Sequence, residues 1–304
     1  MIRIGTRESA LAMWQARHVQ ALLHEAWPEL ETTLVPMTTT GDQILDRPLA
    51  AIGGKGLFVK ELEHAMLEDR IDIAVHSLKD MPTAQPHGLM LDAVVARASA
   101  FDVLCGRDHA WTLETLPQGA RVGTGSKRRE AQLRALRPDV QVVPLRGNVQ
   151  TRLAKRETED LHAVLLAEAG LRRLEIWEAT FSRLDPATFI PAPGQGAVVI
   201  ERRANDPLLA RLLAPLNCAS TDLAVNAERA CLQAIGGDCH TPFAAWASFD
   251  EGGLVLRAKL FDKGTMAQSE GRVPVSPQQC LLGEARELGE RVGSELLAQI
   301  ANRS

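Results

Sequence analysis

The sequence predicts an α/β protein with two lobes of alternating strands and helices, joined by a hinge and followed by a small α+β domain. Three observations predict this class: a length of 304 residues, a strand–helix alternation that occurs twice, and a different pattern after about residue 216. A chain of this length exceeds what one hydrophobic core usually organises. We therefore expect more than one core.

The first ninety or so residues alternate short apolar strands with amphipathic helices. Strands are expected at 2–6, 33–37 and 71–76, and helices from about Ser9 and from Gly56. The strand segments show alternating apolar residues, and the helical segments show apolar residues at a spacing of three to four. This βαβ order favours a parallel or mixed sheet.

The same alternation restarts in the second hundred residues. Strands are expected at 121–124, 141–144 and 163–167, and helices at 126–136 and from Asn148. The Pro- and Gly-rich stretch 191–196 then precedes the apolar run 197–200. We expect this run to return the chain to the first sheet, so that two crossings form a hinge with a cleft between two lobes.

The C-terminal part follows a third pattern. A helix is expected near 222–234, strands near 243–249 and 254–261, and a final helix at 278–300. The predicted domains are residues 1–96 with 197–215, residues 97–196, and residues 216–304.

Composition excludes several classes of protein. Hydrophobic residues make up 45% and charged residues 24%, as in ordinary soluble globular proteins. The formal net charge of −4 gives the molecule no general attraction to nucleic acid. No run approaches the roughly 18 apolar residues of a membrane-spanning helix, and the N-terminus lacks a secretory pattern. We expect a cytoplasmic protein without nucleic acid or membrane partners.

Cysteine usage argues against a disulfide framework and against a metal site. The five cysteines are an odd number and include no CxxC pair, so neither paired bridges nor a zinc knuckle is indicated. At least one of them is a candidate working thiol.

Basic residues follow the predicted strands of the second lobe. In GTGSKRRE (123–130), Ser126 is placed to cap a helix, and a helix N-terminus favours anions. Arg128 and Arg129 add guanidinium groups that pair with carboxylates through two hydrogen bonds. A capped helix with a solvated basic face explains this segment equally well.

Two further segments repeat the arrangement. Arg146 and Arg152 lie in PLRGNVQTRL, and Arg173 follows the strand at 163–167. Ligands of open α/β sheets bind beyond the carboxyl ends of strands, so we expect these clusters to point at one crevice. Arg7 and Ser9, after the first strand, would face the same crevice. A ligand with several carboxylates would match this many guanidinium groups.

Two segments of the first lobe carry candidate functional residues, one at the end of a strand and one in a glycine-rich stretch. AVHSLKDMP (74–82) ends a strand with Lys79 and Asp80, where a carboxylate can steady a cationic intermediate or accept N–H bonds. An Asx-type turn before Pro82 is the bland alternative. GGKGLFVKELE (53–63) lacks the spacing of a phosphate loop and is expected to be an active-site loop carrying Lys55 and Phe58 over the cleft.

Cys239 lies after two glycines and an aspartate in ERACLQAIGGDCHTPFAA, whereas Cys231 lies inside the preceding predicted helix. A thiol in a glycine-rich turn is open to an electrophile, and a helical cysteine is more often buried. A structural cysteine remains an alternative for Cys239. A Cys–His pair with His240 is disfavoured, because consecutive side chains often diverge.

Together these segments resemble the porphobilinogen deaminase (hydroxymethylbilane synthase) family over nearly the entire chain. Matching motifs, in the family's order, are IGTRESALAMWQA, GDQILDRPLA, GGKGLFVKELE, AVHSLKDMP, the SxRR element at 126–129, LRGNVQTRL, PAPGQGAVVIE and the G-x-C-x-x-P turn with Cys239. One departure is Asp238, where the family more commonly has a small residue.

The resemblance implies two lobes similar to type II periplasmic binding proteins and a third domain that carries one dipyrromethane cofactor, linked to Cys239 by a thioether. It implies a monomeric transferase of tetrapyrrole (haem and porphyrin) biosynthesis. Family members join four porphobilinogen molecules head to tail, release ammonia at each step and liberate hydroxymethylbilane. No metal is implied.

The same resemblance assigns roles by matching motif positions. Asp80, buried or partly buried, would accept pyrrole N–H bonds and stabilise positive charge, and Lys79 would pair with a carboxylate. The implied cofactor contacts, besides Cys239, are Ser126, Arg128, Arg129, Arg146, Arg152 and Arg173. The implied substrate contacts are Arg7, Ser9, Arg146 and Arg173.

Two rival functions come from other classes. A small-anion binding protein of the same two-lobed fold would explain the arginine clusters, but neither Asp80 in its motif nor Cys239 on an extra domain. A thiol-dependent hydrolase would need a histidine and an orienting group near Cys239, which the sequence does not reveal.

Overall fold

The computed structural model describes residues 1–43, 59–238 and 241–303. The chain divides into two compact units: unit 1 comprises Met1–Ala98 and Ala197–Asp222, and unit 2 comprises Ser99–Gly196 and Leu223–Ser304. The three expected domain boundaries stay a prediction.

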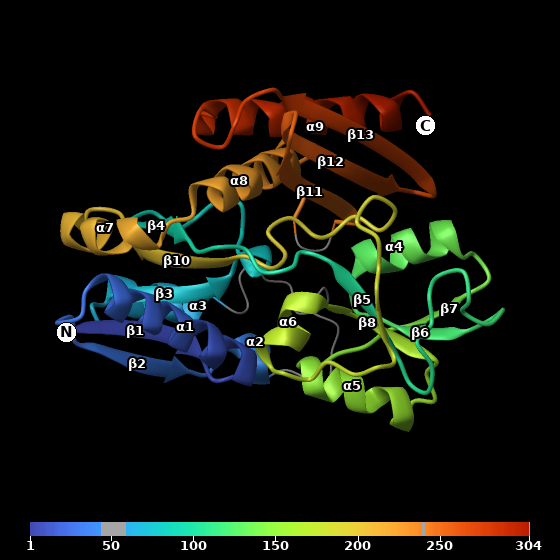
Figure 1. The fold of residues 1–304 in the computed structure, drawn as a ribbon, viewed down its shortest axis with the longest axis horizontal. Helices are drawn as coiled ribbons and strands as arrows, with labels where there is room; N and C mark the ends of the chain where they lie inside the picture. Colours follow the sequence, from blue (N-terminus) through green and yellow to red (C-terminus); the bar gives the residue numbers. More distant parts are fainter. Residues whose placement is uncertain (44–58, 239–240, 304) are drawn as a thin grey trace. The chain divides into compact units, whose positions relative to one another are not determined.

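Unit 1 is built on a five-stranded sheet with the order β2-β1-β3-β10-β4 (Figure 1). Its elements are β1 (Ile2–Arg7), α1 (Ala10–Ala26), β2 (Thr32–Met37), α2 (Thr40–Gln43), α3 (Lys60–Leu67), β3 (Ile73–Ser77), the 3-10 turn η2 (Leu78–Asp80), β4 (Leu89–Val94), β10 (Val198–Arg203), α7 (Pro207–Leu213) and the 3-10 turn η3 (Ala214–Leu216). Strand β1 is parallel to β2 and β3, whereas β10 is antiparallel to β3 and β4.

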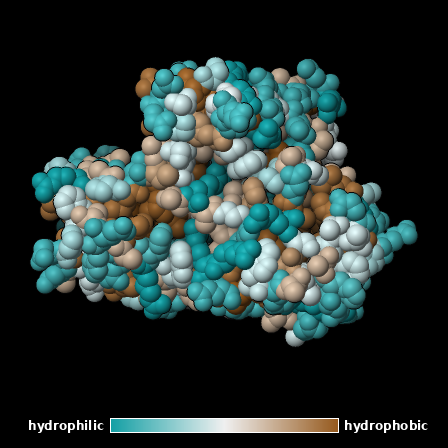
Figure 2. All heavy atoms as spheres, viewed as in Figure 1, coloured by the Kyte–Doolittle hydropathy of each residue, from teal (hydrophilic) through white to brown (hydrophobic). Residues whose placement is uncertain are grey.

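Helices cover both faces of this sheet. On one face, α1 and α7 contribute Val19, Leu23 and Leu213 to a buried cluster with the sheet residues Ile4 and Ile200. Figure 2 shows hydrophobic side chains between α1 and α7, where partly buried members of the cluster reach the surface. On the other face, α3 packs through a second buried cluster that includes residues of β3 and β4. The sheet is therefore held between two apolar layers.

Unit 2 contains a second five-stranded sheet, with the order β7-β6-β8-β5-β9. Its elements are β5 (Asp102–Gly106), β6 (Arg121–Gly123), α4 (Lys127–Leu136), β7 (Gln141–Val143), α5 (Val149–Thr158), β8 (Ala163–Ala167), α6 (Glu168–Arg173) and β9 (Phe181–Arg183). Strand β6 is parallel to β7 and β8, and β5 is antiparallel to β8 and β9.

The two sheets share one strand order. In each, the antiparallel strand occupies the fourth position and is the first strand formed after the chain changes units: β5 after residue 98, β10 after residue 196. The expectation that the run 197–200 returns to the first sheet is confirmed by the pairing of β10 with β3. The expected class, two α/β lobes followed by a small α+β domain, is confirmed.

The C-terminal part of unit 2 has its own sheet and its own core. It consists of α8 (Ala219–Ala234), whose residues up to Asp222 belong to unit 1, and of β11 (Phe243–Asp250), β12 (Gly253–Asp262), β13 (Thr265–Val273) and α9 (Leu282–Ala301), with the antiparallel sheet order β11-β12-β13. Helices α8 and α9 bury Ala227, Leu288 and Val292 against that sheet. The final helix begins at Leu282 rather than at residue 278, because the amides of Gln279 and Cys280 donate to the Ser276 carbonyl in a turn.

No single helix in the described ranges is long and apolar enough to cross a membrane. One bent pair, Pro207–Leu216 with Ala219–Ala234, passes the same length and composition test at an angle of 105°.

Candidate functional site

The basic segments of unit 2 follow strands that end at the same edge of their sheet. Because β6, β7 and β8 are parallel, their carboxyl ends lie together. Ser126 and α4 follow β6, Arg146 follows β7, and Arg173 ends the helix that follows β8. The three segments therefore lie at one edge of the sheet, and their convergence on one crevice stays a prediction.

At the start of α4, the two neighbouring arginines are bound to one buried carboxylate. Arg128 contacts Asp102 through Nη1–Oδ2 at 2.7 Å and Nη2–Oδ1 at 3.2 Å, and the Arg129 Nε donates to Oδ1 at 2.9 Å. All three side chains are almost fully buried. Burial raises the pKa of Asp102, but the two guanidinium groups outweigh it and hold the pKa at about 2. Asp102 is therefore ionised, and the pair keeps an excess of positive charge.

Ser126 fixes the beginning of this helix. It is the N-cap of α4, and its Oγ accepts from the amide of Arg129 at 3.4 Å. Asn148 does the same for α5, where its Oδ1 accepts from the amide of Thr151 at 2.8 Å. The predicted capping role of Ser126 is confirmed, and its oxygen is already engaged within the protein.

The other predicted arginines of this edge are half-buried. The Nε of Arg152 donates to the Gly147 carbonyl at 2.8 Å, and the Nη2 of Arg173 donates to the Gly196 carbonyl at 2.8 Å. Burial lowers the pKa of Arg173 to about 10. A carboxylate brought to this guanidinium would favour its charged form and reverse that shift. Arg146 is half-buried on the same edge.

Adjacent arginines on α6 point to different surroundings. Arg172, next to Arg173, places its guanidinium carbon 3.7 Å from the ring centre of Trp177 and its Nε 3.3 Å from Glu168. It is exposed, and its charge is shared with that carboxylate and that ring. Only the second arginine of the LRRL segment reaches the Gly196 carbonyl.

Unit 1 has a corresponding edge. Because β1 and β3 are parallel, Arg7 at the end of β1 and the segment after β3 lie at the same edge of the sheet. Ser9 is the N-cap of α1 and accepts from the amide of Ala12 at 3.3 Å. The prediction that Arg7 and Ser9 face one crevice with the arginines of unit 2 stays a prediction.

Three contacts hold the segment that carries Asp80. The Oγ of Ser77 accepts from the side-chain amide of Gln15 at 2.8 Å. The backbone amide of Leu78 donates to the Ala197 carbonyl at 3.1 Å. The η2 turn then closes through the Met81 amide, which donates to the Leu78 carbonyl at 3.1 Å. Lys79 and Asp80 therefore project from a short turn that is tied to α1 and to the start of β10.

One expectation about this segment, that Asp80 is buried or partly buried, needs correction. Asp80 is exposed rather than buried, because it occupies the last position of a turn beyond the sheet edge. His76 does not share the surroundings of Ser77, because neighbouring strand residues face opposite sides of a sheet. The His76 ring is buried and its Nε2 lies 3.1 Å from Glu201 on β10.

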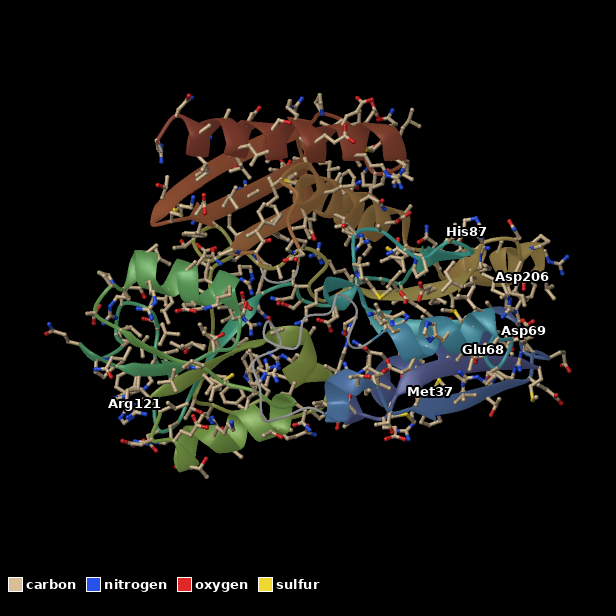
Figure 3. All side chains as sticks on the ribbon, turned by 180° about the vertical axis from the view of Figure 1, so that it is seen from behind. Met37, Glu68, Asp69, His87, Arg121 and Asp206 are labelled. Atoms are coloured by element: carbon tan, nitrogen blue, oxygen red, sulfur yellow. The ribbon has the colours of Figure 1, made fainter. Side chains whose placement is uncertain are left out.

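The opposite edges of both sheets carry charged residues with a different role. In unit 1, Arg203 contacts Asp69 at 3.2 Å, Asp72 at 3.4 Å and Asp206 at 3.5 Å. Figure 3 shows Asp69 and Asp206 at this edge of unit 1, and Arg121 at the amino end of β6 in unit 2. The guanidinium of Arg121 donates to the Glu159 carbonyl at 3.2 Å. At the amino-end edges these arginines are bound to groups of the protein itself. The candidate binding residues are therefore those at the carboxyl ends of the strands.

Three predicted site residues, Lys55, Phe58 and Cys239, lie outside the described residues. Beside Cys239, the amide of Asp238 donates to the Thr241 Oγ1 at 2.9 Å, and that hydroxyl donates to the Asp238 carboxylate at 3.3 Å. Cys231 is fully buried, as expected, and burial raises the pKa of its thiol to about 12.

Comparison with known proteins assigns the family. The model of "Porphobilinogen deaminase, dipyromethane cofactor binding domain" matches residues 2–211, and that of "Porphobilinogen deaminase, C-terminal domain" matches residues 223–298. The chain belongs to the porphobilinogen deaminase family. The porphobilinogen deaminase of Paraburkholderia phymatum is 47% identical over 300 residues, which cover 97% of this chain and 90% of the relative. That of Xanthomonas oryzae pv. oryzae is 47% identical over 295 residues, which cover 97% and 95%.

Solved structures outside the family are less similar. The VFT2 domain of Bordetella pertussis BvgS has a TM-score of 0.45 at 14% identity, over 71% of this chain and 85% of that domain. An arginine-specific periplasmic binding protein of Salmonella typhimurium has a TM-score of 0.40 at 14% identity, over 71% and 91%. These scores are too low to support a fold assignment, which rests on the strand orders above.

Sequence reasoning did not single out three polar residues that the structure buries or half-buries, which are Asp102, Gln195 and Arg229. Asp102 begins β5 between Phe101 and Val103, and a charged residue inside an apolar strand signals a buried ion pair. Gln195 lies in the PAPGQG motif, where its side chain contacts Asp102. Arg229 lies on α8, and burial lowers the pKa of its guanidinium to about 10. The signal for Arg229 was its position in the ER pair of the cysteine motif.

The residues of unit 2 fit an acidic pyrrole cofactor. The Nε of Arg128 is buried and has no hydrogen-bond partner in the described part of the chain. An unpaired N–H of a buried guanidinium is costly, and an arriving carboxylate would satisfy it. Asp102 neutralises only one of the two positive charges of Arg128 and Arg129. The remaining charge also suits dipyrromethane, which carries several carboxylates.

Proposed function

We propose that this chain is a transferase that joins porphobilinogen molecules head to tail, with release of ammonia, to give the linear tetrapyrrole hydroxymethylbilane. Four substrate molecules form each product, as in tetrapyrrole biosynthesis. The observation that carries this proposal is the match of both family models, at residues 2–211 and 223–298. The arginines at one sheet edge supply the chemistry that such substrates require.

Each addition is a substitution at the aminomethyl carbon of porphobilinogen. The C–N bond breaks, the amine leaves as ammonia, and an electron-poor methylene pyrrolenine remains. A C–C bond then forms between this carbon and a free pyrrole α-carbon, which loses its proton. Positive charge develops on ring nitrogens during these steps, so the protein must stabilise a cation while it holds anionic side chains.

The arginines bind the acidic side chains of the pyrroles. Every porphobilinogen unit carries an acetate and a propionate, and guanidinium groups match carboxylates geometrically. We assign Ser126, Arg128, Arg129, Arg146, Arg152 and Arg173 to the cofactor and Arg7, Ser9, Arg146 and Arg173 to the substrate. The lowered pKa of Arg173, caused by burial, supports this assignment because anion binding would relieve it.

Asp80 and Lys79 act at the reacting end. The exposed carboxylate of Asp80 is open to a ligand and would accept pyrrole N–H bonds, stabilising the positive charge of the transition state. Lys79, its neighbour on the η2 turn, would pair with a substrate or cofactor carboxylate. The contacts of Ser77 and Leu78 keep this turn in place, so little reorganisation is required.

Cys239 is an anchor in this proposal. Its sulfur would form one C–S bond with the electron-poor methylene carbon of a pyrrolenine, from which the leaving group has already departed, and afterwards it is a thioether that takes no part in turnover. When bound, dipyrromethane supplies the free α-carbon to which the first porphobilinogen is joined. We assign Lys55 and Phe58 to a loop over the same site.

The decisive experiment measures mass, substrate and ammonia together. The intact purified chain should carry a covalent adduct of two pyrrole units, and it should release one ammonia for each porphobilinogen consumed. An unmodified, folded chain that binds carboxylates and releases no ammonia would instead be a small-anion binding protein, which is the second function that the arginine edge supports.

We also infer that the chain works as a cytoplasmic monomer without nucleic acid or membrane partners. The net charge of −4 supports the absence of nucleic acid binding. Light scattering of the purified protein tests the monomer, and cell fractionation tests the compartment. A dimer mass, or recovery with the membrane fraction, would contradict this inference.

A further inference from the structure

The stretch Pro191–Gly196, here called the 191–196 loop, contacts the arginine edge of unit 2. The Gln195 Nε2 donates to the Ala100 carbonyl at 2.6 Å and to the Asp102 Oδ1 at 3.1 Å. Its Oε1 lies 3.5 Å from the Arg129 Nη2. The amide of this fully buried side chain is therefore part of the same network as the Asp102 carboxylate that binds both arginines.

The backbone of the loop also contacts the arginine edge of unit 2. Gly194 and Gly196, with φ of 70° and 86°, place Gln195 between two left-handed residues, a conformation that glycine adopts without strain. The carbonyl of Gly196 accepts from Arg173 at 2.8 Å. Three of the arginines assigned to ligand carboxylates are thus contacted by this loop or by the carboxylate that it holds.

The loop is also tied to the C-terminal sheet and helix. The amide of Gly194 donates to the Glu228 Oε2 at 2.6 Å, and the amide of Ala247 on β11 donates to the Oε1 of the same carboxylate at 2.8 Å. The Ala245 amide donates to the Pro191 carbonyl at 3.1 Å. Glu228 is fully buried on α8, the helix that precedes Cys239.

We propose that Gln195 is a positioning residue for the reaction: it holds Asp102, and through Asp102 the guanidinium groups of Arg128 and Arg129, in the orientation that receives cofactor carboxylates. Glu228 fixes the loop against the part of the chain that carries the attachment cysteine. The arginines that bind the cofactor carboxylates are thereby tied to the helix that precedes the attachment cysteine of the same cofactor. This inference rests on the proposed function.

The physical reason is the geometry of a guanidinium fork. Arg128 and Arg129 share a single carboxylate, so rotation of Asp102 changes the direction of both. The Gln195 amide donates to the same Oδ1 that accepts from both arginines, and it restrains that rotation. Because the cofactor end must be placed accurately for attack, a small displacement lowers the rate, whereas substrate affinity depends on other residues.

The test compares two buried glutamines of unit 2. Gln195→Leu removes the amide that contacts Asp102. Gln132→Leu, on α4, is the control: its amide exchanges hydrogen bonds of 2.9 and 2.8 Å with the backbone of Ile190, whose carbonyl also accepts from the Arg128 Nη1 at 2.7 Å, and neither Gln132 bond goes to Asp102. Both changes delete buried hydrogen bonds at positions of equal burial.

The Gln195→Leu variant that carries its cofactor should have a kcat roughly tenfold to a hundredfold below that of the wild type. Its KM for porphobilinogen should stay within about twofold of the wild-type value. Gln132→Leu should keep the wild-type kcat, although both variants unfold at a lower temperature. Should Gln195→Leu fail to fold, Glu228→Gln replaces it, because one amide oxygen cannot accept as two carboxylate oxygens do.

Two results would overturn the inference. One is a folded Gln195→Leu or Glu228→Gln protein with wild-type kcat, and the other is an equal fall of kcat in Gln132→Leu. Either result leaves the proposed function standing, provided that the wild-type protein releases ammonia. A wild-type chain without turnover would instead refute the proposed function.

Discussion

At the scale of single residues, the two positions with the strongest sequence signals differ in the role proposed for them. Asp80 lies on the η2 turn and is exposed, so its replacement should not disturb the fold, and the role proposed for it is in ligand chemistry. Cys239 lies between Asp238 and Thr241, which form two hydrogen bonds with each other. These two residues therefore call for different measurements.

Replacing Asp80 should remove activity without affecting the fold. Because its side chain is exposed, Asp80→Ala should leave the melting temperature near that of wild type. Loss of the carboxylate that stabilises positive charge should lower kcat by about a hundredfold or more. Steady-state kinetics with porphobilinogen measure this fall. Asp262→Ala, an exposed aspartate at the end of β12, is the control and should keep full activity; near-normal turnover of Asp80→Ala would remove the assignment.

Replacing Cys239 should abolish cofactor attachment. Cys239→Ser should yield a folded chain whose intact mass lacks the two pyrrole units, because a serine hydroxyl is a far weaker nucleophile than a thiolate. Cys231→Ala is the control: that thiol is fully buried, burial raises its pKa to about 12, and the adduct should persist. An adduct that survives in Cys239→Ser would contradict the anchor.

At the scale of elements, the predicted strands and helices with strong apolar periodicity are present. Strand β8 occupies the predicted residues 163–167, and α4 ends at Leu136, before Pro138. Strand β13 was not predicted, because its sequence TMAQSEGRV is polar and offers little alternation. It forms at the edge of its sheet, where pairing with β12 decides its conformation. Local pattern therefore predicted many of the elements that bury one face, and it missed β13, which depends on its neighbour, as well as β4, β5 and β9.

The packing of α9 on α8 gives a test at this scale. A Cβ added at Gly289 would overlap the Ala227 carbonyl oxygen and come within 2.7 Å of the Ala230 Cβ. Alanine normally stabilises a helix relative to glycine, but here steric overlap should dominate. Gly289→Ala should lower the free energy of unfolding by about 1–3 kcal/mol, measured by urea denaturation.

Gly283 on the same helix is the matched control. A Cβ there would meet nothing within 4 Å. Gly283→Ala should raise the free energy of unfolding by about 0.5–1 kcal/mol, because the unfolded chain loses freedom and the helix gains propensity. Equal effects of the two substitutions would show that the α8–α9 contact is looser than described.

At the scale of the whole molecule, Asp102 links acid stability to the arginine edge. Its pKa is lowered from 3.8 to about 2. A carboxylate whose folded-state pKa is lowered contributes stability above its unfolded pKa, and that contribution is lost as pH falls through the folded pKa. The expected loss between pH 5 and pH 2 is about 2 kcal/mol from this residue.

Urea denaturation at several pH values checks this expectation. Asp102→Asn should lower the free energy of unfolding at pH 7 by about 3–5 kcal/mol, because two buried guanidinium groups lose their carboxylate. The variant should also lose stability less steeply than wild type below pH 5. Parallel pH profiles of the two proteins would contradict the assigned pKa.

Much of the function was determined by the sequence alone. The motif order along the chain identified the family, and with it the reaction and the dipyrromethane cofactor; that Cys239 is the attachment cysteine stays a prediction. The alternation of strands and helices, with the apolar return at 197–200, determined the two α/β lobes. Caps such as Ser126 were also readable, since capping depends on residues only three positions apart.

Only the tertiary structure decided how the charges are distributed. Arg128 and Arg129 looked alike as ligand groups, yet both share Asp102, which lies 26 and 27 positions away in the chain. Gln195 and Glu228 join that network from still farther away. Asp80, which was expected to be buried or partly buried, is exposed. Burial and pairing depend on contacts between distant segments, and periodicity within one segment carries no information about them.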